Sequence, residues 1–259
     1  MRQESARTSA DSLVRVLSAS PGALERYTVL ILDAMREDAA ATGRESPLSP
    51  DTTTRSRDRR PRKRPFLRDM FTGASELHSS LEQLDAIVVY ARSFPYRNKK
   101  VTKGGHLRYH FEAYIQEVGM LRMRLHAYLT VIERLYMQDE QFPPIKHVLK
   151  VVRRSSKEEF KWFVDARDGH VHQERFSDSQ LTSLSSLELI ASAYPGTNVS
   201  MGALRTFAKE YREAKKTKVQ LMKDWNRSFR RLIDMYFQLL MPFVAGTDKR
   251  LRWPPGAIK

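Results

Sequence analysis

The stretch that decides the fold is HLRYHFEAYIQEVGMLRMRLHAYLTVIERLYM, residues 106–137. Apolar and aromatic side chains recur in it every three or four residues over about eight turns, the spacing that places them on one face of an α-helix. This stripe consists of His110, Tyr114, Val118, Leu121, Leu125, Tyr128, Ile132 and Leu135. A helix with so long an apolar face must bury it against other helices, so the stretch predicts a helical bundle.

Similar stripes elsewhere predict the partner helices. They lie at about residues 74–93, 145–166 and 201–241, with a short helix around 181–193. Prolines and glycines separate these segments, and no run alternates strictly between apolar and polar residues, so no sheet is expected. The predicted fold class is all-α, a bundle of four main helices with a partly disordered N-terminal arm.

The chain divides into four parts around this bundle. Residues 1–42 are expected to hold one amphipathic helix, with Ser20 as its cap. Residues 43–68 have the proline-rich and strongly basic composition of a disordered linker. The bundle is expected to occupy residues 69–241, and residues 242–259 are expected to form an irregular tail.

The formal net charge of +15 indicates an anionic partner. Nucleic acid is the commonest polyanion and an anionic membrane the second, while solvated helix faces account for the charge equally well. The chain has no cysteine, which excludes disulfides, thiolate zinc sites and cysteine nucleophiles. It has no apolar run of about 18 residues and no secretory signal, so no membrane span and a cytoplasmic location are expected.

Basic residues are concentrated in two places. Eight lie between Arg55 and Arg68, where Asp58 is the one acid, and ten lie between Arg205 and Arg231. Such blocks bind nucleic acid in many proteins, although linkers, nuclear localisation signals and solvated helix faces have the same composition. The residues predicted to contact nucleic acid are Arg59, Arg60, Arg62, Lys63, Arg64, Lys215 and Lys216.

The six residues Arg167-Asp168-Gly169-His170-Val171-His172 place a histidine five positions after an arginine, near the end of a predicted helix. An arginine followed by a polar residue and then a histidine at this spacing resembles the signature of the HEPN superfamily, in which asparagine is the most frequent residue at the position of Asp168. The resemblance implies a helical bundle that binds RNA. It also implies a metal-independent endoribonuclease of a toxin or defence system, which needs no cofactor and pairs two motifs across a homodimer.

The chemistry of RNA cleavage suits the residue types of this motif. The ribose 2′-hydroxyl attacks the adjacent phosphate, a step that needs a base, an acid and a group that stabilises negative charge. His172 suits the first two roles because the ordinary pKa of histidine is about 6.5. Arg167 suits the third because its guanidinium forms paired hydrogen bonds with phosphate oxygens. Asp168 is expected to orient one of these two side chains.

Three other interpretations remain open. Arg167 and His172 are residue types that stabilise the end of a helix by interacting with its last carbonyls. His170 and His172 form a pair that binds a metal only if further ligands, such as His106 and His110, lie nearby. In the third interpretation the chain is a non-catalytic helical module that binds nucleic acid or an acidic protein partner through its basic arm.

Overall fold

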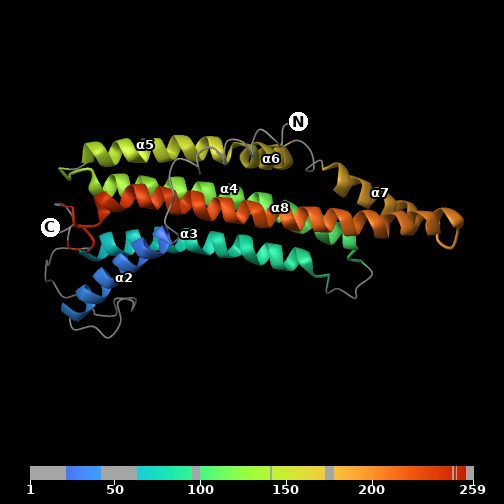
Figure 1. Ribbon diagram of the computed structural model, residues 1–259, viewed down its shortest axis with the longest axis horizontal. Helices are drawn as coiled ribbons and strands as arrows, with labels where there is room; N and C mark the ends of the chain where they lie inside the picture. The colour runs from blue at the N-terminus through green and yellow to red at the C-terminus, as the bar shows by residue number, and fades with distance from the viewer. Residues whose placement is uncertain are drawn as a thin grey trace. The chain divides into compact units, whose positions relative to one another are not determined.

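The computed structural model describes residues 22–41, 63–94, 100–140, 142–172, 178–246, 248 and 250–254, without the side chains of residues 63–65 and 169–172. Within these residues the chain forms seven helices and no strand (Figure 1). The helices are α2 (Ala23–Ala41), α3 (Lys63–Arg92), α4 (Lys103–Tyr136), α5 (Phe142–Glu159), α6 (Lys161–His172), α7 (Ser179–Ala193) and α8 (Asn198–Val244). The all-α prediction is confirmed, whereas the expected count of four main helices is not.

The described helices belong to two compact units. Unit 1 consists of residues up to 79 together with 122–159 and 230–259, and unit 2 consists of 80–121 and 160–229. Unit 1 therefore contains α2, α5 and parts of α3, α4 and α8, while unit 2 contains α6, α7 and the other parts of those three helices. Each unit has its own buried residues.

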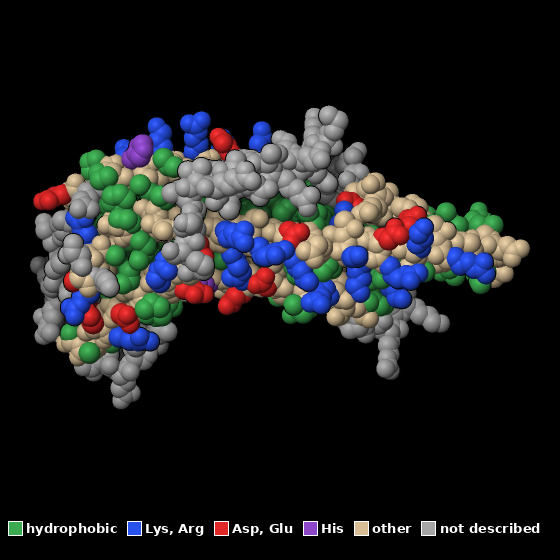
Figure 2. All heavy atoms as spheres, viewed as in Figure 1, with side chains coloured by type: hydrophobic (Ala, Val, Ile, Leu, Met, Phe, Trp, Pro, Cys, Tyr) green, Lys and Arg blue, Asp and Glu red, His purple; other side chains and the backbone are tan. Residues whose placement is uncertain are grey.

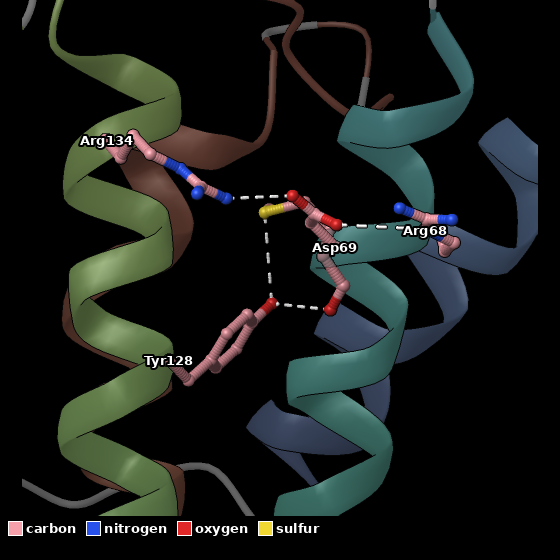
Figure 3. A network of polar contacts seen from close by, with 5 residues as sticks. Arg68, Asp69, Tyr128 and Arg134 are labelled. Carbon is pink, nitrogen blue, oxygen red and sulfur yellow. Dashed lines mark hydrogen bonds and ion pairs between the residues drawn. The ribbon is translucent and has the colours of Figure 1, made fainter.

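Buried tyrosines occupy the core of unit 1. Tyr128 of α4 and Tyr27 of α2 are almost wholly buried, and their hydroxyl oxygens lie 2.7 Å apart. The Tyr128 hydroxyl donates to the main-chain carbonyl of Met70 in α3 at 2.9 Å (Figure 3). Tyr27 is then the donor between the two tyrosines, because each hydroxyl carries one proton. Burial raises the pKa of both hydroxyls, so they stay protonated.

Gly73 of α3 makes room for the ring of Tyr128. A Cβ atom at position 73 would lie 2.0 Å from that ring, so the two helices meet where only glycine fits. Near the surface, Arg134 of α4 pairs with Asp69 of α3 at 2.8 Å, and Arg68 lies 3.9 Å from the same carboxylate (Figure 3). Because these ion pairs are solvent-exposed, they stabilise the contact less than the buried tyrosine does.

An acidic side chain from α8 holds the first turn of α2. The carboxylate of Asp234 accepts the main-chain N–H groups of Gly22 and Leu24, at 3.1 Å each. A carboxylate at this position satisfies N–H groups that the helix leaves unpaired and interacts favourably with its dipole. The amphipathic helix predicted within residues 1–42 is therefore present as α2, and the predicted cap Ser20 lies outside the described residues.

The predicted linker ends earlier than expected. α3 begins at Lys63, so residues 63–68 are helical and the prediction of a disordered linker over 43–68 is wrong for this part. Burial of Phe66 provides the reason, because its ring lies 6.0 Å from that of Tyr136 and 5.2 Å from that of Trp253. These partners are distant in sequence, and composition alone does not reveal them.

The described part of the C-terminal segment packs on unit 1. α8 extends to Val244, and the described residues after it form no helix or strand, as the predicted irregular tail requires. An isolated antiparallel bridge joins Ala245 to Leu251, which is buried. The hydroxyl of Tyr136 donates to the carbonyl of Arg252 at 2.9 Å, and the guanidinium of Arg252 donates to the buried Asp139 at 2.7 Å. Hydrogen bonds to α4 and the residues that follow it therefore order this segment.

The helix predicted at 145–166 is two helices. α5 ends at Glu159 and α6 begins at Lys161, on either side of Phe160. Phe160 is fully buried and stacks on Phe229 of α8, with ring centroids 5.0 Å apart. No glycine or proline stands near this position, so the local sequence contains no signal for the break, which accompanies tertiary packing.

Unit 2 combines an aromatic core with buried polar pairs. Trp225 of α8 lies among the rings of Phe111, Tyr114, Trp162 and Phe163. The hydroxyl of Tyr114 donates to the side-chain oxygen of Asn226 at 2.6 Å. In turn, Asn226 donates to Asp85 of α3 at 2.7 Å. These hydrogen bonds pair the polar groups that the core would otherwise leave unsatisfied.

We expect Gly73→Ala to lower the free energy of unfolding by about 2–3 kcal/mol, because the added methyl group overlaps the Tyr128 ring. Urea unfolding followed by far-UV circular dichroism measures the change. Gly202→Ala is the matched control, since it adds the same methyl group to a helix where no atom lies within 4 Å. The control should be neutral or stabilise by up to about 1 kcal/mol. Equal effects of the two variants would contradict the proposed close approach.

Candidate functional site

The predicted catalytic motif lies at the end of α6 in unit 2. Arg167 is half-buried, and its Cδ atom lies 2.9 Å from the place that a Cβ atom on Gly119 of α4 would take. The arginine side chain therefore crosses α4 where that helix has no side chain. Asp168 is exposed. The side chains of His170 and His172 lie outside the described residues, so the predicted approach of Arg167 and His172 stays a prediction.

The predicted basic arm lies almost entirely outside the described residues. This holds for Arg59, Arg60 and Arg62, and for the side chains of Lys63 and Arg64. The main chain of the last two belongs to the first turn of α3. Their proposed contacts with nucleic acid therefore stay predictions.

The basic residues of α8 in unit 2 form a stripe along one face of the helix. Their intervals of four, three, four, seven and four residues keep their directions within about 60° around the helix axis. We call this set the α8 basic stripe, and its members are Arg205, Lys209, Arg212, Lys216, Lys223 and Arg227. Lys223 is half-buried and the other five are exposed. Figure 2 shows Lys and Arg side chains along α8.

Acidic side chains of α8 lie beside the stripe or away from it. Asp224 stands at its border and pairs with Arg227. Glu210 points toward α7, where it accepts a hydrogen bond from the hydroxyl of Ser183 at 2.6 Å. Glu213 is exposed and lies beside the stripe, four residues after Lys209 and three before Lys216, so no acid of α8 stands within the stripe itself but two flank it. The number of basic residues in this part of the sequence does not identify Arg205, Lys209 and Arg227 as members of one surface. Their spacing of three, four and seven residues along a helix is the signal that identifies them.

The two predicted lysines of α8 have different surroundings. Lys216 is an exposed member of the stripe. Lys215 is half-buried, with its Nζ atom 5.9 Å from the centre of the Tyr211 ring. Its positive charge also lowers the pKa of His106 near the start of α4. Lys216 thus shares a face with the other stripe lysines, and Lys215 interacts with groups inside unit 2.

His106 and His110 form a pair on α4, with ring centroids 4.5 Å apart. His106 is buried, and the centre of its ring lies 5.4 Å from that of Phe94. Burial lowers the pKa of His106, and the charge of Lys215 lowers it further. Burial also lowers the pKa of His110, with His106 as the second cause. Both rings therefore favour the neutral form in the folded protein.

A metal site at these histidines needs additional ligands. Among the residues that the structure describes, no group of three or more His, Cys, Asp or Glu side chains is arranged to hold a metal ion. The combination with His170 and His172 involves side chains outside that description. Among the described residues, only His106 and His110 therefore support the interpretation of a metal site.

Comparison of the chain with protein-family models, with curated proteins and with solved structures finds no match in any of the three. The resemblance to the HEPN superfamily therefore stays a prediction from residues 167–172 of the sequence. Within the described part of the chain, no helix combines the length and apolar character that crossing a membrane requires.

The lowered pKa values of His106 and His110 predict that stability decreases as the pH falls from about 7 to 5.5. In the unfolded chain each histidine has its ordinary pKa of about 6.5, so below this pH protons bind the unfolded state more readily. The stability that the neutral rings contribute is fully present above about pH 6.5 and is lost as the pH falls toward their folded pKa values. Urea denaturation at a series of pH values measures this loss.

The double variant His106→Gln and His110→Gln should show a smaller loss of stability over the same range. Some loss should remain, because burial also lowers the pKa of His126 in unit 1. His147→Gln, at an exposed position of α5, is the matched control and should behave like the wild type. An unchanged pH dependence in the double variant would show that the pair does not couple protonation to folding.

Proposed function

We propose that this chain is an RNA-binding protein that holds the sugar-phosphate backbone along the α8 basic stripe. The observation that carries the proposal is six basic residues on one helix face, spread over about 33 Å at the helical rise of about 1.5 Å per residue. Most neighbours in the stripe are closer than the Debye length of about 8 Å, so their potentials add. Such a row attracts phosphates without reading the base sequence.

RNA is the proposed polyanion because the motif in α6 resembles that of an RNA-binding superfamily. The stripe and the motif both belong to unit 2. The strongly positive net charge of the chain supports rapid encounter with a polyanion. In the non-catalytic alternative, the basic arm makes the contacts and α8 presents a solvated face.

We expect the triple variant Lys209→Gln, Lys216→Gln and Lys223→Gln to bind single-stranded RNA about tenfold more weakly at physiological salt. Loss of three phosphate contacts should also reduce the slope of log affinity against log salt by about 2, at about 0.7 per contact. Fluorescence anisotropy with a labelled RNA of mixed sequence, repeated at several salt concentrations, measures both quantities.

A triple variant of α5 is the matched control. Lys146, Lys150 and Lys157 are exposed and lie on another helix, so their replacement by glutamine removes the same charge. The proposal requires the α8 variant to lose more affinity than the α5 variant. Equal losses would mean that net charge, and not the stripe, attracts RNA, and unchanged binding in both would direct attention to the basic arm.

A second candidate function is metal-independent cleavage of the bound RNA. It is favoured by the position of Arg167, a half-buried arginine that lies against the bare backbone at Gly119 and is therefore restrained near the end of α6. In this proposal Arg167 stabilises the charge on the phosphate, His172 transfers protons, and Asp168 orients one of them. The proposed enzyme is a homodimer of a toxin or defence system that joins two such motifs.

We expect cleavage of an end-labelled RNA pool in EDTA by the wild type and its loss in Arg167→Ala and His172→Ala. Gly119→Ala should reduce cleavage by about tenfold or more, because its methyl group displaces Arg167 without removing it. Arg154→Ala and His147→Ala change the same residue types at exposed positions of α5 and should leave cleavage unchanged. Equal cleavage by all variants would reveal a contaminant or another site, and RNA binding without cleavage would leave the stripe as the function.

A further inference from the structure

Apolar side chains are exposed where α7 and α8 meet. We call residues 189–204 the α7–α8 tip, and within it only Ser200 and Ala203 are buried. The apolar side chains exposed there are Leu189 (68%), Ile190 (38%), Tyr194 (56%), Val199 (58%), Met201 (51%) and Leu204 (49%). Figure 2 shows hydrophobic side chains at this end of α7 and α8. A group of this kind on a soluble surface is typical of an interaction site.

α7 carries large apolar residues on several of its faces. Its large apolar residues stand at positions 181, 184, 187, 189 and 190, which point in different directions around the helix axis. Of these, Leu181 and Leu184 are buried. Leu189 and Ile190 are exposed, so the end of α7 adds two apolar side chains to the surface of the tip.

Most hydroxyl groups of α7 and the tip have partners within the hairpin. Five donate to main-chain carbonyls: Ser185 to Leu181 (3.1 Å), Ser186 to Thr182 (3.1 Å), Ser192 to Leu189 (2.8 Å), Thr197 to Tyr194 (2.7 Å) and Ser200 to Ala191 (3.0 Å). Hydroxyls in membrane helices are paired in the same way, because lipid supplies no partner for them. Their transfer from water into an interface is therefore less costly than for free hydroxyls.

The tip itself contains no charged residue, and no acid occurs between Leu189 and Lys209. The first two charged residues of α8, Arg205 and Lys209, are both basic. The nearest acid, Glu188, already accepts hydrogen bonds from the N–H of Gly104 (2.9 Å) and the hydroxyl of Thr102 (2.7 Å). A second copy of the chain would bring two such positive surfaces together, which disfavours it as the occupant.

The size of the tip also disfavours a protein partner. Six side chains that are each about half exposed present on the order of 500 Å² of apolar surface, less than the roughly 800 Å² that each side contributes to a standard protein interface. A lipid surface needs no complementary shape. Apolar residues next to lysines and arginines are the pattern of segments that lie in the interface of an anionic bilayer.

We propose that the α7–α8 tip inserts into the surface of an anionic membrane. Leu189, Val199 and their apolar neighbours enter the boundary between headgroups and acyl chains, and Tyr194 lies at headgroup depth. Arg205 and Lys209 contact lipid phosphates. The chain binds to one face of the bilayer through this tip. The proposal does not depend on the proposed RNA binding.

The absence of cysteine allows a clean test, because a single introduced cysteine carries the only label. Leu189→Cys, Val199→Cys and Met137→Cys are each labelled with an NBD fluorophore and mixed with vesicles of phosphatidylcholine containing about 30% phosphatidylglycerol. We expect a blue shift and increased emission at positions 189 and 199. Met137 is equally exposed but belongs to unit 1, and its label should not respond. No response at 189 and 199, or equal responses at all three positions, would overturn the proposal.

Vesicle sedimentation with unlabelled protein provides the second arm. Leu189→Glu with Val199→Glu should weaken binding to the anionic vesicles by about tenfold or more, while Val29→Glu with Met137→Glu, two exposed positions of unit 1, should not. Neutral phosphatidylcholine vesicles should bind the wild type at least about tenfold more weakly than the anionic vesicles do. Equal loss in both double variants would overturn the proposal. The proposal would also be overturned if light scattering showed a dimer for the wild type and a monomer for the Leu189→Glu, Val199→Glu variant, because a second copy of the chain would then cover the tip.

Discussion

A phenol ring that fits only against glycine is the constraint on which unit 1 depends. Tyr128 occupies the space where residue 73 would place a Cβ atom, and its hydroxyl is buried beyond the reach of solvent. That hydroxyl must find a partner, and it finds the carbonyl of Met70 and the hydroxyl of Tyr27. α2, α3 and α4 are consequently held by one group of hydrogen bonds. The ring of Phe237 from α8 packs 4.9 Å from that of Tyr27 and adds the fourth helix.

In unit 2, too, a buried polar group must find a partner, and here the groups are charged. Lys218 of α8 is almost fully buried, and it pairs with Asp178, whose other oxygen accepts the N–H of Leu181 at the start of α7. The ammonium group also lies 5.0 Å above the ring of Phe111. Removing either charge would leave the other unpaired in the core, which is far more costly than keeping both. This pair therefore fixes where α7 starts relative to α8, and with it the position of the tip.

Periodicity predicts where most of the helical segments lie, because burial of one face creates it, but it does not predict all of their ends. Tyr114, Val118, Leu121, Leu125, Tyr128 and Ile132 from the stretch at 106–137 are all buried, as their spacing predicts. Features that depend on residues far apart in the sequence were not predictable. The cap of α2 comes from Asp234, some 210 residues later, and the break at Phe160 accompanies stacking on Phe229. For the candidate site, spacing alone reveals the stripe on α8, whereas the contact of Arg167 with Gly119 requires the fold.

The proposed RNA site and the proposed membrane site share two residues of α8. Arg205 and Lys209 begin the α8 basic stripe and also follow the α7–α8 tip directly. If both proposals hold, lipid phosphates and RNA phosphates compete for these two side chains, and each ligand must weaken the other by the same factor. Arg212, Lys216, Lys223 and Arg227 lie farther from the tip and stay available to RNA. The competition is therefore partial, and a membrane-bound chain retains most of its affinity for a strand that follows the rest of the helix.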